Sequence, residues 1–318
     1  MDIVVIGAGS MAIAYAKTLK HLGLSFRCMG RGAESANRFE AETGVAAGTG
    51  PLVEQLMKTD VTDALAIVAV DLNQLSTVCA SLIDAGVHAI LVEKPGGVDL
   101  ADMQILADLD TRNCIRVAYN RRFFKSTQKA LDLIKSDGGA QLIHFEFTEL
   151  PDRIESMGVH PHEVLANLPY ANSSHVFDMA FHLGLASEDL SEVVVSGAVR
   201  QGEISWHPDG SRFASCGLVG DQSVFNCFAD WRSGGNWNVE ITTAERRLRL
   251  RPLETLTVQL RESFQVDPVE ISADPEGLKP GLPDMVQDFI LNGGKKLPSM
   301  RHQVERMKVF AKLLSRDH

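Results

Sequence analysis

The sequence predicts an α/β fold in two parts: a first domain with a doubly wound parallel sheet, then an α+β domain with a large open and mainly antiparallel sheet. Three observations support this fold class. Apolar runs alternate with amphipathic stretches over the first part of the chain, a glycine-rich turn follows the first run, and closely spaced alternating runs fill the second part. Strand–helix alternation favours parallel pairing, whereas short connections favour antiparallel pairing. The 318 residues suffice for two ordinary domains.

The expected strands of the first domain are short and apolar. They cover Ile3–Ile6, Ser25–Met29, Ala64–Val70, Ala89–Glu93 and Cys114–Ala118. Amphipathic helices are expected between them at Ala12–Leu22, Ala33–Thr43, Leu72–Ala85 and Leu100–Leu109. Because parallel strands are joined by crossovers, these helices should cover both faces of the sheet.

The alternation of strand and helix patterns ends near Tyr119–Arg122, so we expect one domain at residues 1–120 and a second at residues 121–318. The second domain should begin with a helix, Ser126–Lys135, a strand, Gln141–Glu149, and a long polar loop, Leu150–Asn172, before a helix at Ser174–Leu185. Its later strands are expected at Glu192–Val199, Phe213–Val219, Ser223–Asp230, Trp237–Thr242, Arg246–Leu250 and Thr255–Leu260. Two helices, around Pro283–Leu291 and His302–Leu314, end the chain and are candidates to pack on the first domain.

Composition and charge disfavour several kinds of partner and location. The formal net charge of −10 disfavours nucleic acid and anionic membranes. No apolar run approaches the roughly 18 residues of a membrane span, and the chain opens with the strand-like DIVVIG, which does not resemble a signal peptide. The five cysteines are odd in number and show no CxxC spacing, which favours reduced thiols. We therefore expect a soluble cytoplasmic protein.

The motif GAGSMA directly follows the first expected strand. It fits the GxGxxA form of the dinucleotide-binding fingerprint. Gly7 permits a tight turn, Gly9 lets a pyrophosphate approach the backbone, and Ala12 lets the helix pack closely on the strand. Ser10 and Met11 complete the predicted contacts at the helix N-terminus, whose amides and dipole favour phosphates. In its strand–turn–helix context the motif predicts a Rossmann domain that binds a dinucleotide.

The end of the second expected strand indicates whether the domain binds NAD or NADP. NAD-binding domains usually place an acidic residue there, about 20 residues beyond the glycines, to bind the ribose 2′-hydroxyl. Here the sequence reads Met29-Gly30-Arg31-Gly32. An arginine suits the 2′-phosphate of NADP, which it can bind in bidentate fashion, and Ser35 is a further candidate contact. The sequence thus favours NADP over NAD, with stacking of Arg31 on the adenine as the alternative.

The motif VEKPGG closes the expected strand Ala89–Glu93. Ligands of such sheets bind outside the carboxyl ends of the strands, and a lysine is costly to bury without a partner, so Lys94 indicates a function. Glu93 and Lys94 point to opposite sides if both lie on the strand. Asp71 and Asn73, which follow the preceding strand, are further candidate cofactor contacts. An ordinary turn is the alternative for Asn73.

The segments GAGSMA, AIVAVDLNQ and AGVHAILVEKPGG, in this order, resemble the Gfo/Idh/MocA oxidoreductases, the relatives of glucose–fructose oxidoreductase and inositol dehydrogenase. The resemblance extends over most of the chain and is strongest over residues 1 to 125. It implies an NAD(P)-dependent oxidoreductase in which Lys94 lies beside the nicotinamide and the substrate hydroxyl, with Glu93 in the cofactor site.

The family's second signature is DxxxH on a helix of the second domain, matched here by Asp178 and His182. Residues four apart share a helical face, and His175 lies on the same side one turn earlier. The resemblance implies that His182 exchanges a proton with the substrate oxygen, while Asp178 orients the ring or holds a substrate hydroxyl. Two alternatives remain: His182 as a core histidine, and a metal site formed by all three residues. The family generally needs no metal.

The chain departs from the family where many members have glycines before this helix, because it reads Asn172-Ser173-Ser174-His175. The segments NSSHVFD and YNRRFF resemble a branch found among bacterial sugar and surface-polysaccharide genes. Asn120, Arg121, Arg122 and His175 are therefore candidate substrate contacts, since polar and cationic groups suit a polyhydroxylated ligand that carries a carboxylate or phosphate. For each arginine a structural ion pair between domains is the alternative.

The expected function is hydride transfer between a nicotinamide and a carbinol or carbonyl carbon of a sugar or sugar derivative. The catalytic candidates are Lys94, Asp178 and His182. By family analogy we also expect a homodimer or homotetramer formed through the open face of the second sheet. The alternatives are a reductase of a non-sugar, such as a diol, an imine or a tetrapyrrole, and a non-catalytic dinucleotide-binding sensor.

Overall fold

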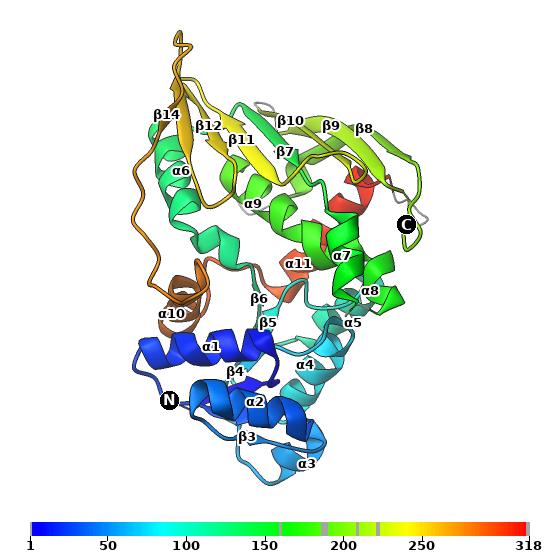
Figure 1. Ribbon diagram of the computed structural model, residues 1–318, viewed down its shortest axis with the longest axis vertical. Coiled ribbons are helices and arrows are strands. Elements are labelled where there is room, and N and C mark those ends of the chain that lie inside the picture. Colours follow the sequence, from blue (N-terminus) through cyan, green and yellow to red (C-terminus); the bar gives the residue numbers. More distant parts are fainter. Residues whose placement is uncertain (1, 159–160, 186–189, 208–209, 221–222, 316–318) are drawn as a thin grey trace. The chain divides into compact units, whose positions relative to one another are not determined.

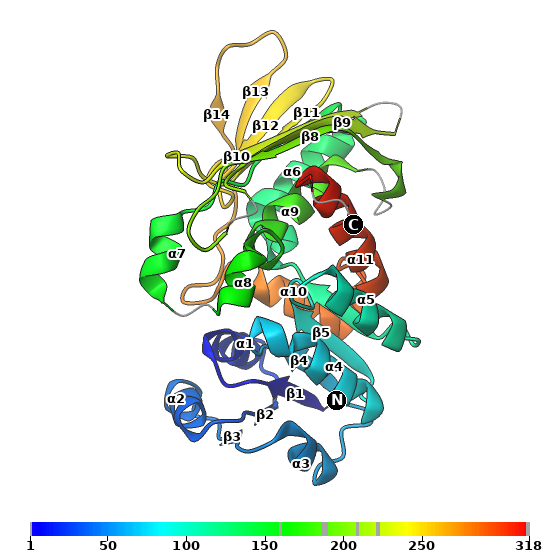
Figure 2. The same ribbon diagram turned by 90° about the vertical axis from the view of Figure 1, so that its right-hand side faces the viewer.

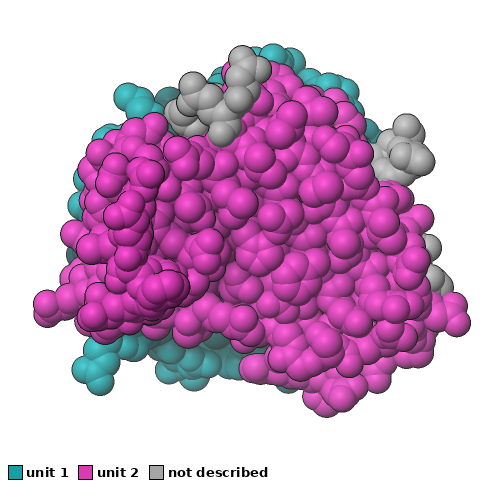
Figure 3. Space-filling view, turned by 90° about the horizontal axis from the view of Figure 1, so that it is seen from above, with its two compact units in different colours: residues 1–120, 274–304 teal, residues 121–273, 305–318 magenta. Residues whose placement is uncertain are grey.

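The computed structural model describes residues 2–158, 161–185, 190–207, 210–220 and 223–315. The chain divides into two compact units, drawn in separate colours in Figure 3. The first unit contains residues 1–120 and 274–304, and the second contains residues 121–273 and 305–318. Each unit is built on one large sheet.

The first unit contains a parallel sheet with the strand order β3-β2-β1-β4-β5-β6. Its strands are β1 (Ile3–Ile6), β2 (Arg27–Met29), β3 (Ala47–Gly48), β4 (Leu65–Val68), β5 (Ala89–Glu93) and β6 (Ile115–Ala118). Residues of the central strands β1 and β4 are buried throughout, as expected for a sheet covered on both faces. The strand order reverses between β1 and β4, which is where doubly wound sheets bind their ligands.

Helices flank this sheet (Figures 1 and 2). They are α1 (Ser10–His21), α2 (Ala33–Thr43), α3 (Leu52–Met57), α4 (Leu75–Asp84), which follows the 3-10 turn η1 (Leu72–Gln74), and α5 (Leu100–Leu109). The sequence-based prediction of a Rossmann-type sheet is confirmed. The short strand β3 and helix α3 were not expected, since two and six residues are too few to show a periodic pattern.

A segment from late in the chain also belongs to the first unit. It contains α10 (Leu282–Asn292) and the start of α11 (Met300–Leu313). The backbone of Val117 in β6 donates to Pro298 O at 3.0 Å, and the Gln303 side chain donates to Pro95 O at 3.1 Å and contacts the Tyr119 hydroxyl at 2.8 Å. These bonds hold the segment against the ends of β5 and β6.

The second unit contains a mixed sheet with the order β14-β13-β12-β11-β7-β10-β9-β8. Its strands are β7 (Leu142–Glu146), β8 (Val193–Gln201), β9 (Arg212–Val219), β10 (Ser223–Asp230), β11 (Asn238–Thr242), β12 (Arg246–Leu250), β13 (Thr257–Leu260) and β14 (Asp267–Pro268). The pairing is antiparallel except between β7 and β10, which are parallel. The expectation of a mainly antiparallel sheet is therefore confirmed.

Two helices, α6 (Lys125–Ser136) and α9 (Ser174–Gly184), pack against this sheet. Aromatic rings of β7 and α9 form its core: Phe145 lies 5.3 Å from Phe177 and 5.9 Å from Phe181, in both cases edge to face. Ten of the eleven residues of α9 are buried. A helix so deeply packed holds its polar side chains in fixed positions.

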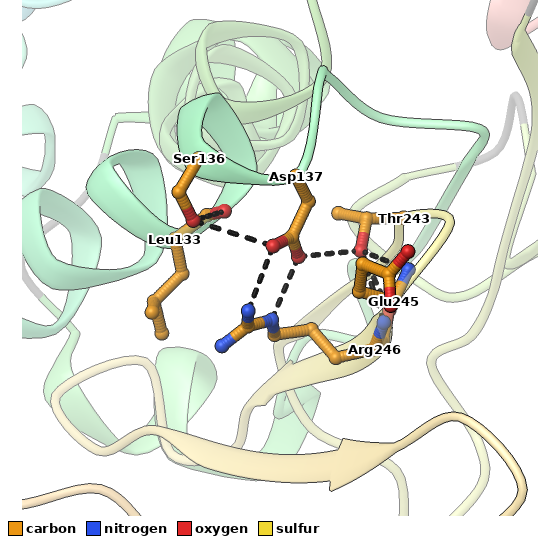
Figure 4. A network of polar contacts seen from close by, with 6 residues as sticks. All are labelled: Leu133, Ser136, Asp137, Thr243, Glu245 and Arg246. Carbon is orange, nitrogen blue, oxygen red and sulfur yellow. Dashed lines mark hydrogen bonds and ion pairs between the residues drawn. The ribbon is translucent and has the colours of Figure 1, made fainter.

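A polar network joins α6 to the turn between β11 and β12 (Figure 4). Arg246 donates to both carboxylate oxygens of Asp137 at 2.7 Å, and the Thr243 hydroxyl donates to the same carboxylate at 2.7 Å. The Asp137 side chain is 3% exposed and that of Arg246 is 22% exposed. A bidentate pair of this geometry fixes the C-terminal end of α6 to the turn between β11 and β12.

The expectation of a polar loop at Leu150–Asn172 is wrong. The segment contains α7 (Pro151–Met157), α8 (His162–Ala166) and the start of a π-helical turn, η3 (Pro169–Ser173). Each prolyl residue sits at or just before a helix start. Proline is well suited to that position because its φ is already helical and its missing N–H would have had no helical partner. Three prolines thus mark three helix starts.

Two further expectations concern cysteines and membranes. The five cysteines are free; Cys28, Cys79 and Cys227 are buried, and burial raises the pKa of Cys28 to about 12. A thiol with so high a pKa is not a nucleophile at neutral pH. Among the described residues, no helix combines the length and the apolar character needed to cross a membrane.

Candidate active site

The glycine-rich turn lies at the carboxyl end of β1. Gly7 has φ +109°, and a Cβ at this position would lie 2.3 Å from Ala69 O at the end of β4. Its N–H donates to Met29 O at the end of β2, at 2.8 Å. Gly7 is therefore fixed between the ends of three strands, where only glycine fits.

The same turn leaves open space where a pyrophosphate is expected. A Cβ added to Gly9 would meet no atom within 4 Å, and α1 begins with the next residue. Ser10 is exposed and Met11 half-buried, whereas Ala12 is fully buried against the sheet. The first turn of α1 contains no acidic residue. The arrangement suits an anion. The first N–H groups of a helix have no partner within the helix, and the positive end of the helix dipole lies at the same place, beside the open space at Gly9.

The end of β2 presents a cation. Gly30 donates its N–H to Gly48 O at 2.8 Å, and its carbonyl accepts from the Gln55 side chain at 2.7 Å. Arg31, next in the chain, is exposed, and the half-buried Ser35 donates its hydroxyl to Gly32 O at 3.0 Å. Gln55, which sequence reasoning missed, thus holds the backbone from which Arg31 projects.

A basic pocket of about 300 Å³ lies beside α1. It is lined by Ser10, Ile13, Ala14, Lys17, Arg38, Glu42, Gly277, Leu278 and Lys279. Lys17 pairs with Glu42 at 2.8 Å, and Lys279 Nζ lies 2.8 Å from Met11 Sδ beside the glycine-rich turn. Three cationic side chains and one acidic side chain give this end of the first unit a net positive charge.

Glu93 and Lys94 follow at the end of β5, two strands from β1. The hydroxyl of the fully buried Tyr15 donates to Glu93 Oε1 at 2.6 Å. Burial raises the pKa of Glu93, and the Tyr15 hydrogen bond and the charges of Lys94 and Lys279 only partly offset it. The Lys94–Pro95 peptide bond, which the sequence left open, is cis. Sequence reasoning did not identify Tyr15 as a partner of Glu93, because the two residues are 78 positions apart and no local pattern links α1 to β5.

Asp71 and Asn73 lie at the end of β4, next to β1 and β5. Both side chains are exposed, and Asp71 precedes the turn η1, to which Asn73 belongs. The first unit therefore brings the predicted cofactor residues together at one edge of its sheet. Asn120, predicted to bind substrate, also lies in this unit and donates its side-chain amide to Pro280 O at 3.0 Å.

Asp178, in the middle of α9, is 1% exposed and paired with two arginines. Arg122 donates from Nε and Nη2 to its two oxygens at 2.8 and 2.7 Å, and Arg306 Nη1 lies 3.2 Å from Oδ1. Both arginine side chains are also only 1% exposed. The structure therefore places Arg122 in a buried pair with Asp178, inside the second unit. The Asp178 carboxylate is directed to these cations.

The two histidines of α9 lie in different surroundings. His182, in the last turn, is half-buried. His175, in the first turn, is 6% exposed, and its ring lies 6.4 Å from that of Trp237. Arg121 lies over the same indole, with Cζ 4.9 Å from the ring centroid. Thus Arg121 and His175, both predicted to bind substrate, meet at Trp237.

No group of three or more His, Cys, Asp or Glu side chains among the described residues has a geometry that could hold a metal ion. The alternative of a metal site formed by His175, Asp178 and His182 is therefore not supported, because Asp178 pairs with the arginines and His175 contacts Trp237.

No protein-family model and no curated protein matches the sequence. Among solved structures, UDP-N-acetylglucosamine 3-dehydrogenase from Acidithiobacillus ferrooxidans superposes with a TM-score of 0.73 at 16% identity, over 99% of this chain and 97% of that one. The chain has the fold of the Gfo/Idh/MocA oxidoreductases.

Two further solved structures superpose on this chain over nearly its whole length. An oxidoreductase from Agrobacterium radiobacter, in complex with NAD+, L-tartaric acid and magnesium, gives a TM-score of 0.79 at 13% identity over 99% of this chain and 96% of that chain. Levoglucosan dehydrogenase in complex with NADH gives 0.78 at 15% identity, with the same coverage. The predicted resemblance is thus confirmed for the fold of the whole chain, while the chemistry rests on the residues of this site.

Proposed function

We propose that this protein is an NAD(P)-dependent oxidoreductase that transfers a hydride between the nicotinamide and a carbinol or carbonyl carbon of a sugar or sugar derivative. The observation that carries the proposal is the position of Glu93 and Lys94 at the carboxyl end of β5, on the same sheet edge as the glycine-rich turn after β1. The surface-polysaccharide branch that NSSHVFD resembles is the metabolic setting we propose, in the cytoplasm.

The residues of the first unit fit a dinucleotide. The backbone at Gly7 admits no side chain, Gly9 has open space, and the α1 amides face it, so a pyrophosphate would be held there. At the end of β2 the exposed Arg31 stands where NAD-binding domains have an acid, and Arg38 and Lys279 add positive charge beside α1. This supports NADP over NAD. When bound, the nicotinamide supplies the hydride chemistry.

The protein's own task is to bind the substrate oxygen and manage its proton. Lys94 would place its ammonium at that oxygen and stabilise negative charge as it develops. His182 would accept or return the proton, because an imidazole titrates near neutral pH. Asp178 would act as a positioning residue: held by Arg122 and Arg306, it fixes the α9 turn that precedes His182.

Replacement of Lys94 tests this proposal. In Lys94→Met we expect the affinity for NADPH to stay within about twofold, while turnover falls by about a hundredfold or more, the size typical of a lost proton-transfer or charge-stabilising group. Turnover is measured with a panel of sugars and sugar derivatives. Lys58→Met, on the exposed end of α3, is the matched control and should keep full activity. Full activity in Lys94→Met would remove Lys94 from the mechanism.

A further inference from the structure

A cation from late in the chain lies beside the glycine-rich turn. Lys279 Nζ is 2.8 Å from Sδ of Met11, in the first turn of α1, although the two residues are 268 positions apart. Lys279 also lines the pocket of about 300 Å³ beside α1, together with Ser10. All of these residues belong to the first unit. The fold therefore brings a positive charge to the place where the phosphates of the proposed cofactor would lie.

The backbone that carries Lys279 is held within the first unit. The Lys279 carbonyl accepts from the Leu282 N–H at 3.1 Å, which joins it to the start of α10. The carbonyl of the next residue, Pro280, accepts from the Asn120 side-chain amide at 3.0 Å, just after β6. The side chain of Lys279 is exposed and has four methylene groups, so a movable ammonium projects from a fixed backbone.

The ammonium of Lys279 contacts only a weak acceptor. A thioether sulfur accepts a hydrogen bond poorly and carries no charge, and no carboxylate among the described residues forms an ion pair with Lys279. The other lysine of the pocket differs, because Lys17 pairs with Glu42 at 2.8 Å. Lys279 is therefore the better candidate of the two for binding an anionic ligand.

The charge of Lys279 also acts on the end of β5. Burial raises the pKa of Glu93, and the charge of Lys279 is among the interactions that act in the opposite direction. Lys279 thus lies close to the glycine-rich turn after β1 and within electrostatic range of the end of β5. A dinucleotide bound across the carboxyl edge of this sheet would place its pyrophosphate at the start of α1, on its way to β5.

We infer that Lys279 binds the pyrophosphate of the dinucleotide, as a cofactor-binding residue from the segment between β14 and α10. This inference rests on the proposed oxidoreductase function. The amides at the start of α1 offer hydrogen bonds and the helix dipole, but no full charge. Lys279 supplies that charge, and its ammonium can exchange the Met11 sulfur for a phosphate oxygen. Arg31, at the end of β2, would bind a different group, the 2′-phosphate.

The test is a fluorescence titration of Lys279→Met with NADPH and with NADH. We expect the affinities for both to fall about tenfold or more and by similar factors, because both dinucleotides contain the pyrophosphate. Lys279→Arg should keep most of the affinity. Lys295→Met removes another exposed lysine from the late segment of the first unit, so it is the matched control and should bind both normally. Thermal unfolding checks the fold of each variant, with Lys279→Gln as a second neutral variant.

The outcomes separate the inference from the proposed function. A similar fall for the two dinucleotides supports the inference. A fall for NADPH alone would assign Lys279 to the 2′-phosphate and overturn it, as would unchanged affinity for both in the folded neutral variants. In either case the proposed function stands if the unmodified protein binds NADPH and Gly9→Ala does not. If the unmodified protein binds neither dinucleotide, the proposed function fails and the inference with it.

Discussion

Asp178 shows how far a motif can be interpreted at the scale of one residue. The DxxxH spacing correctly places Asp178 and His182 on one helix, but not the partners of the carboxylate. Arg122 is 56 residues before Asp178 and Arg306 is 128 residues after it, so only the tertiary fold brings them together. The same holds for Tyr15 and Glu93, which are 78 residues apart. Sequence indicates the type of group at a site more readily than its buried partner.

We expect Asp178→Asn to destabilise the protein by about 3–5 kcal/mol, because it leaves two buried arginines without their counter-charge. Urea unfolding measures this free energy. Turnover of the folded fraction should fall as well, since the His182 turn loses its support. If stability stays unchanged while turnover is lost, Asp178 acts directly on the substrate and not as a positioning residue.

The two glycines of the turn should respond differently to the same substitution. Gly7→Ala adds a methyl group 2.3 Å from Ala69 O in a left-handed backbone and should lower the melting temperature clearly. Gly9→Ala adds it to open space in an extended backbone, so stability should be kept. Affinity for NADPH should nevertheless drop by about tenfold or more, because the methyl group blocks the pyrophosphate. Normal NADPH affinity in a folded Gly9→Ala protein would contradict the cofactor site.

At the scale of elements, the sequence predicted what local periodicity controls. Helices Ala33–Thr43 and Leu100–Leu109 and strands Ile3–Ile6 and Ser223–Asp230 have the predicted limits. For Leu100–Leu109 a local signal sets the start, since the Asp99 side chain accepts from the Asp102 N–H at 2.9 Å. Parallel pairing of β7 with β10 was not predictable, because strands so distant in sequence leave no local signal.

The ion pair between Asp137 and Arg246, which joins α6 to the β11–β12 turn, predicts that the free energy of unfolding depends on pH (Figure 4). Burial acts to raise the pKa of Asp137, but hydrogen bonds from Arg246 and Thr243 outweigh it and hold the pKa below its ordinary value of 3.8. The folded state thus favours the ionised form. Its stabilisation is present above about pH 4 and is lost as the pH falls through the lowered pKa.

Asp137→Asn should therefore reduce the free energy of unfolding by about 1.5–3 kcal/mol at pH 7, the size of a charged hydrogen-bonded pair. The difference from the unmodified protein should shrink at a pH below the lowered pKa, where both proteins carry a neutral side chain at this position. Urea unfolding at both pH values measures it. Asp132→Asn, exposed on the same helix, is the control. A deficit of the same size at both pH values would show that the charge contributes nothing.

At the scale of the whole molecule, the exposed face of the second sheet predicts self-association. Val194, Leu218 and Val224 pair across β8, β9 and β10 and are 46–56% exposed, and Phe228 on β10 is 42% exposed. Apolar side chains in adjacent rows form the kind of patch that a partner usually covers. We expect a homodimer or homotetramer that Leu218→Lys with Val224→Lys dissociates, whereas Val53→Lys on α3 does not. Sedimentation would decide, and a monomeric unmodified protein would contradict the expectation.

The proposed function requires the chain to bind a nicotinamide dinucleotide at the glycine-rich turn after β1 and at the end of β2. The measurement that tests it most directly is a fluorescence titration of the protein with NADPH and with NADH, side by side, repeated on Arg31→Ala. We expect NADPH to bind more tightly, with the difference lost in Arg31→Ala. Equal or tighter binding of NADH would contradict the 2′-phosphate argument, and binding of neither would contradict the oxidoreductase function itself.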